Sequence, residues 1–179
     1  RTSRKTIAIQ ITLDGDVTVR APRDCEKAEI DDLIRDRREW IEEKRAEFLA
    51  QKRECEKKQE QFPKITPESE REFRRLAKEK IPKRVALFAE QVGVDYGKIT
   101  IKDTKSRWGS CSYQGNLNFC WRLILAPEEV LDYIVVHELC HRLEMNHSAR
   151  FWAEVKRVFP EYEKSKEWLK ENGLALLER

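Results

Sequence analysis

The chain has 179 residues, of which 39% are charged and 40% are apolar, and its formal net charge is +3. This composition predicts a folded protein with long solvated helices, because a disordered chain would carry fewer apolar residues. The length suits one domain with an appended arm, or two small domains. No apolar run approaches the roughly 18 residues that span a bilayer, and the net charge is too small to indicate a nucleic-acid partner.

The five cysteines are odd in number and include no C-x-x-C pair. Free thiols in a reducing compartment are the simplest interpretation of that pattern. Since the sequence also lacks an apolar signal core, we expect a cytoplasmic protein with no membrane partner.

The first third of the chain predicts a β-hairpin followed by a helical arm. Residues 4–20 alternate in strand fashion around Asp14-Gly15-Asp16, and Pro22 ends this pattern. Residues 25–61 keep apolar side chains at helical spacing within a highly charged segment, so one long helix is expected. Such a helix either packs on the rest of the protein or serves as an interaction arm. We assign residues 1–62 to this hairpin and arm.

Residues 63–179 predict a second, mixed domain. Thr66 and Pro67 start a helix that Pro82 should kink and Gly93 should end. A strand at 98–102 and a hairpin at 106–121 follow, with the hairpin turn near Gly115. Three further helices are expected, beginning at Pro127, beginning at Ser148, and ending at Gly173. The fold class is therefore α+β.

All three histidines of the chain lie within eleven residues, and the first two frame an H-E-x-x-H motif. His137 and His141 are four apart, so on a helix they share one face and can reach one metal ion. Glu138 projects beside that ion, where it can act as general base toward a zinc-activated water. With His147 as third ligand, one coordination position stays open for water. This is the pattern of a catalytic site with one Zn2+ per chain.

The environment of the motif supports a metal. Residues 130–136 are apolar on nearly every side, which predicts a buried helix. A buried helix that carries two histidines and a glutamate would cost several kcal/mol in polar desolvation if these groups had no partners. A cation and its bound water are such partners.

The third ligand has competitors. Glu144 faces the same way as His137, but lies about 10 Å further along a continuous helix, too far to bind the same ion comfortably. His147 can swing back only if the chain leaves the helix between Leu143 and Asn146. We expect His147 to be the ligand, and the carboxylates Glu144, Glu154 and Glu161 remain the alternatives.

A larger set of motifs resembles a known family. These motifs are Ser106-Arg107-Trp108-Gly109-Ser110-Cys111-Ser112, Asn116-Leu117-Asn118, Leu125-Ala126-Pro127, the H-E-x-x-H segment, Asn146-His147-Ser148 and Phe151-Trp152. They closely resemble the YgjP-like metal-dependent hydrolases, a zincin-type group related to the SprT-like and WLM peptidases. The resemblance covers essentially the whole chain. It implies a zincin-like metallopeptidase core, with a small antiparallel sheet beside the H-E-x-x-H helix, and the same three ligands and base.

Three functions remain in play. The favoured one is a zinc metallopeptidase that acts within the chains of peptides or unfolded proteins, in which Glu138 first takes and later returns a proton. The alternative is a metal-dependent nucleotide (UTP) pyrophosphatase, an activity also assigned to the family. Arg107, Lys105 and Arg150 could hold the phosphates of a nucleoside triphosphate if they converge. The SprT kinship adds a third, a DNA-associated protease or a non-enzymatic binding module.

The hairpin at 106–121 supplies the candidate substrate contacts. A peptide could add as a strand beside residues 107–112, because main-chain bonding needs few specific side chains. Asn116 and Asn118 alternate on one face and either bind the substrate backbone or bond a loop. Trp108 and Trp121 are expected to pack on the adjacent helix. The candidate substrate-binding residues are Arg107, Trp108, Gly109, Ser110, Asn116 and Asn118.

Overall fold

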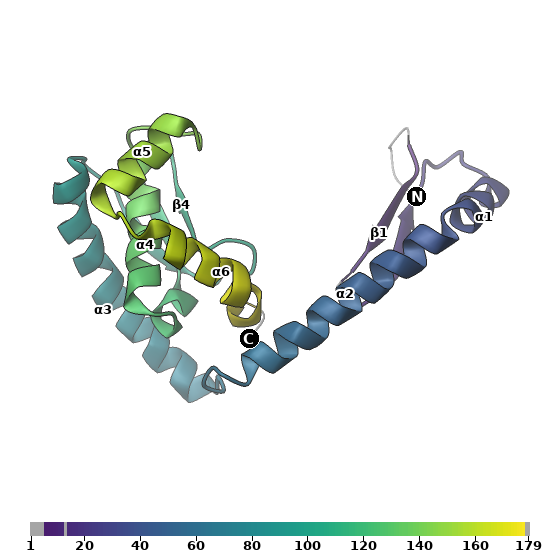
Figure 1. The fold of residues 1–179 in the computed structure, drawn as a ribbon, viewed down its shortest axis with the longest axis horizontal. Coiled ribbons are helices and arrows are strands. Elements are labelled where there is room, and N and C mark those ends of the chain that lie inside the picture. The colour runs from purple at the N-terminus through teal and green to yellow at the C-terminus, as the bar shows by residue number, and fades with distance from the viewer. Residues whose placement is uncertain (1–5, 13, 178–179) are drawn as a thin grey trace. The chain divides into compact units, whose positions relative to one another are not determined.

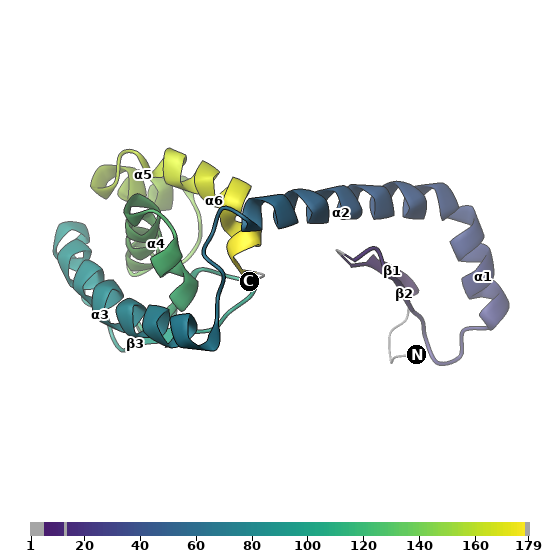
Figure 2. The same ribbon diagram turned by 90° about the horizontal axis from the view of Figure 1, so that it is seen from below.

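The computed structural model describes residues 6–12 and 14–177, so residues 4, 5 and 13 of the predicted hairpin lie outside the described part. The chain forms two compact units, Arg1–Lys58 and Gln59–Arg179. No helix in the described ranges is long and apolar enough to cross a membrane. Figures 1 and 2 show the elements of each unit.

The first unit contains the predicted hairpin and two helices in place of one. Strands β1 (Ala8–Ile11) and β2 (Val17–Arg20) pair in antiparallel register. Helix α1 (Lys27–Asp36) ends at Arg37, whose φ of −101° and ψ of 11° lie outside the helical range, and α2 (Arg38–Gln59) starts directly after it. The expectation of one continuous helix over 25–61 was therefore wrong at Arg37.

Within this unit the hairpin turn is tied to α2 by polar contacts. Arg45 donates to the carbonyl of Gly15 at 2.9 Å, and Lys52 pairs with Asp14 at 2.5 Å. The side chain of Leu49 packs against Gly15. These contacts use one face of the charged helix, which explains how so polar a segment takes part in a folded unit.

The second unit begins with α3 (Pro67–Val92), whose two ends are as predicted. Thr66 and Ser69 form a reciprocal capping box at its start, and Gly93 ends it in the left-handed conformation with φ of 80°. The helix continues through Pro82.

A three-stranded sheet follows, in the order β3-β5-β4. Strands β4 (Gly109–Cys111) and β5 (Leu117–Cys120) form the predicted antiparallel hairpin. Strand β3 (Ile99–Lys102) pairs with β5 in parallel, so the sheet is mixed where an antiparallel one was predicted. The segment between β3 and β4 carries the chain past β5, which leaves β4 at the edge.

The central helix is α4 (Glu128–Cys140), which follows the short 3-10 helix η1 (Trp121–Leu125). Ten of its thirteen residues are buried, as its all-round apolar pattern predicted. It contacts α3, α5, α6, η1 and β4, and it lies between α3 and the α5–α6 pair in Figure 2. The H-E-x-x-H motif therefore sits in the middle of the core, on the side that faces the edge strand.

Helices α5 (Ala149–Val158) and α6 (Tyr162–Leu177) complete the unit. Helix α6 does not end at Gly173 as predicted. Gly173 is buried inside the helix against the indole of Trp108, where an added Cβ would lie 3.3 Å from Nε1. A small residue is needed there for packing, so the helix continues through a residue that often ends helices.

Candidate metal centre

The end of α4 brings the first two histidines onto one face. His141 caps the helix but keeps a helical backbone, with φ of −64° and ψ of −14°, so the four-residue spacing still acts as one turn. The chain then tightens, because the amides of Leu143 and Glu144 both donate to the carbonyl of Cys140 at 3.0 Å. The turn begins earlier than predicted. It also needs no glycine, since no described non-glycine residue has a positive φ.

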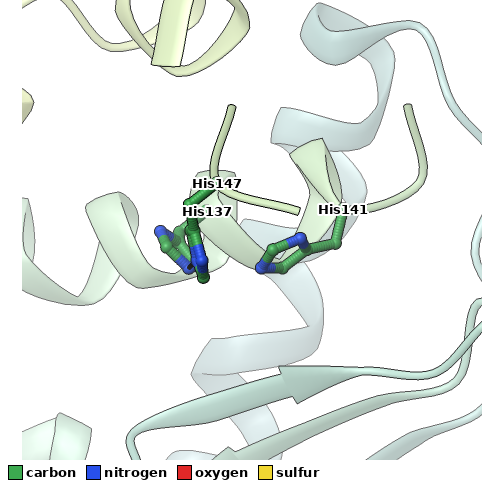
Figure 3. A group of neighbouring side chains, drawn as sticks. All are labelled: His137, His141 and His147. Atoms are coloured by element: carbon green, nitrogen blue, oxygen red, sulfur yellow. Dashed lines mark hydrogen bonds between the residues drawn. The ribbon is translucent and has the colours of Figure 1, made fainter. Parts of the chain in front are cut away.

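This turn returns His147 to the other two histidines. Figure 3 shows the rings of His137 and His147 side by side, with the ring of His141 directed toward them. One ligand nitrogen from each ring lies within 4.8 Å of the others, and the Nε2 atoms of His137 and His147 are 3.0 Å apart. Two imidazoles bound to one zinc at about 2.0–2.1 Å hold their nitrogens at a comparable distance.

The alternative carboxylates do not join this cluster. Glu154 pairs with Arg157 at 2.8 Å, and Glu161 pairs with Lys164. Glu144 approaches through its backbone, whose carbonyl lies 3.1 Å from Nδ1 of His141. That contact suits an Nδ1–H donor, which leaves Nε2 of His141 with a free lone pair.

Burial disfavours the protonated form of His137 and His141. It lowers the pKa of His137 to about 3, with smaller effects in the same direction from His141 and His147. It also lowers the pKa of His141, although the Glu144 carbonyl acts the other way. A neutral imidazole is the form that binds a metal, so His137 is prepared for binding at neutral pH.

Glu138 is held beside the trio in an unusual environment. Its side chain is 5% exposed, and Oε2 is buried without a hydrogen-bond partner. Burial raises its pKa to about 8, and the positive charge of Arg107 acts in the opposite direction. A carboxyl with a pKa near neutral can both accept and return a proton.

A cleft of about 460 Å³ opens in front of these groups. The predicted substrate residues Arg107, Gly109 and Ser110 line it, together with Ser106, Cys111, Met145, the three histidines and Glu138. Gly109 approaches Glu138 so closely that an added Cβ would lie 2.5 Å from Oε1. The edge strand β4 therefore forms one wall, and the carboxyl fits only because position 109 has no side chain.

The remaining predicted substrate residues lie elsewhere. Trp108 packs on α6, and Trp121 is fully buried and stacks on Phe73, as expected for both tryptophans. Asn116 accepts from the amide of Lys98 at 2.9 Å, which is the loop-bonding alternative. Asn118 donates to Ser110 at 3.1 Å and faces a second cavity. Neither asparagine lines the cleft.

Sequence reasoning did not anticipate the role of Phe151. Its fully buried ring contacts all three imidazoles, with centroid distances of 4.9 Å to His137, 4.6 Å to His141 and 4.8 Å to His147. Trp152 stacks on His147 at 5.8 Å. Their positions in the helix that Ser148 caps predicted that both side chains lie on its inner face. The pattern did not indicate that this face would contact the histidines.

The family model for the YgjP-like metallopeptidase domain matches residues 5–66 and 57–172. The chain belongs to the YgjP-like family. Its metallopeptidase domain implies a catalytic metal, and the trio of histidines on one side of the cleft provides ligands of the right chemistry. This YgjP-like chain is thus a metallohydrolase of the metallopeptidase type.

Two solved structures are similar to part of this YgjP-like chain. One is the metallopeptidase zymogen of Pyrococcus abyssi, abylysin, with 23% identity over 51% of this chain and 93% of that one, and a TM-score of 0.47. The other is the metallopeptidase zymogen of Methanocaldococcus jannaschii, jannalysin, with 27% identity over 51% and 92%, and a TM-score of 0.44. No curated protein matches the chain.

Proposed function

We propose that the chain is a zinc-dependent metallopeptidase that cleaves within peptides or unfolded proteins. His137, His141 and His147 would hold the ion, and Glu138 would serve as the general base. The observation that carries the proposal is the meeting of three imidazole nitrogens within 4.8 Å, beside a buried carboxyl oxygen that has no partner.

The residues fit a zinc ion on chemical grounds. Three neutral imidazoles are the donor set of many catalytic zinc sites, and they leave one position open. The unpartnered Oε2 of Glu138 would cost about 1–3 kcal/mol if nothing bonded it, and a water held between the carboxyl and the ion would remove that cost. Zinc bound to this trio would supply a Lewis acid for the scissile carbonyl and lower the pKa of the attacking water.

Proton transfer and substrate orientation are carried out by residues of the chain. In its ionised form Glu138 accepts a proton from the attacking water at Oε2 and later gives it to the leaving amine. The wall formed by β4 orients the substrate. Because β4 is the edge strand, its outer side has no strand partner among the described residues and can pair with an extended peptide.

The test combines metal analysis with two assays. The wild type should hold about one zinc per chain, and the variant His137→Ala/His141→Ala should hold none. Unfolded protein should be cleaved, and Glu138→Gln should lose two to four orders of magnitude in rate while it keeps the zinc. Stoichiometric zinc in the double variant would refute the site. Hydrolysis of UTP without cleavage of protein would refute the peptidase.

A further inference from the structure

A second cavity of about 330 Å³ adjoins the cleft and is not explained by the proposed chemistry. We call it the hairpin cavity, since strands β4 and β5 supply half of its wall. It is lined by Lys102, Thr104, Ser106, Arg107, Trp108, Gly109, Ser110, Asn118, Phe119 and Cys120. Four of these residues, Ser106, Arg107, Gly109 and Ser110, also line the cleft, so the two spaces share a wall.

The charged side chains of this cavity are two cations, and neither forms an ion pair among the described residues. Lys102 and Arg107 line it, and no carboxylate does. The nearest acid in sequence, Asp103, already pairs with Arg74 at 2.7 Å and with Arg122. Arg84 of α3 and Arg157 of α5 bond acids, whereas the guanidinium of Arg107 makes no hydrogen bond or ion pair within the described residues. The charge of Arg107 also acts on Glu138, whose pKa it lowers, but no ion pair among the described residues occupies the guanidinium, so it can bond a ligand.

The neutral groups of the cavity also offer donors. Ser110 accepts a hydrogen bond from the side-chain amide of Asn118 at 3.1 Å, so its own hydroxyl hydrogen is available. Thr104 donates to the carbonyl of Arg107 at 2.7 Å, which anchors the backbone that carries the guanidinium. Two cations and a free hydroxyl at an anchored loop form a site for an anion, since bidentate Arg–carboxylate bonding is strong and directional.

The size of the hairpin cavity favours a peptide carboxylate over a nucleotide as the anion. A volume of about 330 Å³ lies at the lower limit of small-molecule sites and accommodates one side chain or chain end rather than a whole nucleotide. Lys105 and Arg150, which a triphosphate would also need, line neither space. A peptide carboxylate fits these dimensions.

The geometry points to the hairpin cavity as a subsite that binds a carboxylate of the substrate next to the scissile bond, with Arg107 and Lys102 as its specificity-determining residues. This inference rests on the proposed peptidase function. The carboxylate is that of an aspartate or glutamate side chain, or of the peptide's C-terminus. Both would enter through the wall that the cavity shares with the cleft.

The cleavage test uses mixed peptides, followed by matched synthetic pairs. Wild-type protein should cut preferentially beside an acidic residue, or beside the last residue. Pairs that differ only in Glu or Gln at that position, each with a free or amidated C-terminus, separate the two sources. The acidic member should have a kcat/KM higher by about 10- to 100-fold, the range of a charge-assisted bond.

The variants assign the preference to its residues. Arg107→Gln and Lys102→Gln should bring the ratio of kcat/KM for the Glu peptide to kcat/KM for the Gln peptide toward one, and Arg107→Glu should favour a lysine peptide. The ratio is the readout because the charge of Arg107 also acts on the pKa of Glu138, so its loss changes the rate on both peptides. The matched control is Lys105→Gln, a loop lysine that lines neither space and should keep the preference. Equal kcat/KM on both peptides for the wild type, or an equal loss of kcat/KM on both in Arg107→Gln, would overturn this inference. The proposed peptidase function would still stand.

A binding measurement separates this failure from that of the proposed function. Calorimetry with the Glu138→Gln variant should show tighter binding of the acidic peptide, and Arg107→Gln should remove the difference. If the wild type cleaves no peptide, the peptidase proposal fails, and a retained acidic preference in binding still supports the subsite. If binding also shows no preference, the subsite is refuted as well.

Discussion

Gly109 and Glu138 approach each other so closely that the backbone of β4 limits where the Glu138 carboxyl can lie. An added Cβ at position 109 would sit 2.5 Å from Oε1 and 2.7 Å from Cγ of Glu138. Both distances are shorter than van der Waals contact, so one of the two elements must move. The absence of a side chain at position 109 is thus a condition for the position of the carboxyl.

Gly109→Ala should therefore displace Glu138 and lower kcat by about 10- to 100-fold, since small misplacements of a catalytic group are costly. Zinc content should be retained, because the three histidines belong to other parts of the cleft wall than position 109. The control is Gly93→Ala, where nothing lies within 4 Å of the added Cβ but φ is 80°. That variant should be less stable by about 1 kcal/mol and should keep its kcat. Full activity of Gly109→Ala would show that the close contact does not position the base.

The raised pKa of Glu138 makes the stability of the metal-free protein depend on pH. The carboxyl has a pKa of about 8 when folded, because it is buried, and about 4.3 when unfolded. Between these values the folded state holds a proton that the unfolded state has lost. The free energy of unfolding should thus fall as pH rises, by about 1.4 kcal/mol per pH unit from this group.

Glu138→Gln has no proton to lose, so it should become progressively more stable than the wild type between about pH 5 and pH 8. Urea unfolding in the presence of a chelator, at several pH values, measures the difference. The depressed pKa of His137 affects both proteins equally and cancels. A difference that stays constant with pH would mean that the carboxyl is not buried as the structure has it.

At the level of single residues, the sequence predicted which histidines come together better than it predicted the residues that pack around them. Spacing alone brings His137 and His141 together, because a helix has a fixed period. The contacts that Phe151 and Gly109 make depend on how α5 and β4 pack against α4, and no local pattern contains that information.

Helix α5 connects the third histidine to the core, and its first residue is fixed by a cap. Ser148, which directly follows His147, accepts a hydrogen bond from the amide of Phe151 at 3.3 Å. The same bond therefore stabilises the helix and orients the ring that contacts the imidazoles. The cap of α3 at Thr66 is similar in chemistry but begins a different helix.

Ser148→Ala should lower stability by about 1 kcal/mol, the usual cost of losing an N-cap. It should also weaken zinc binding, because the backbone next to His147 loses its anchor. Thr66→Ala is the matched control and should show a similar loss of stability with unchanged zinc affinity. Competition with a chromogenic chelator measures the affinity. Equal zinc affinity in the two variants would show that the Ser148 cap does not contribute to zinc binding.

Element boundaries were predictable where a local signal fixes them. Thr66, Gly93 and Ser148 act through their own backbone bonds, and all three boundaries were predicted. The break at Arg37 has no proline or glycine to announce it. The parallel pairing of β3 and the continuation of α6 past Gly173 depend on neighbours distant in sequence, so local patterns gave the wrong answer there.

At the level of the whole molecule, the large apolar core belongs entirely to the second unit. Its buried residues run from Ala77 to Val155, and the partly buried ones around it lie between Ile65 and Leu169. In the first unit, by contrast, the buried apolar residues are Ala21, Cys25, Ile41 and Cys55 among those described. Since burial of apolar surface is the main source of folding stability, the two units should differ greatly in autonomy.

A fragment of residues 59–179 should therefore fold alone, unfold cooperatively and bind about one zinc. Thermal unfolding by circular dichroism and metal analysis test this, and added zinc should raise the midpoint by mass action. A fragment of residues 63–179, which follows the boundary expected from sequence, is the matched comparison. It lacks Phe62, whose ring meets Trp168 edge-on at 6.1 Å, so it should be less stable by about 1 kcal/mol. If residues 59–179 stay unfolded with zinc present, the second unit depends on the first, and the division of the chain into an arm and an autonomous catalytic domain is wrong.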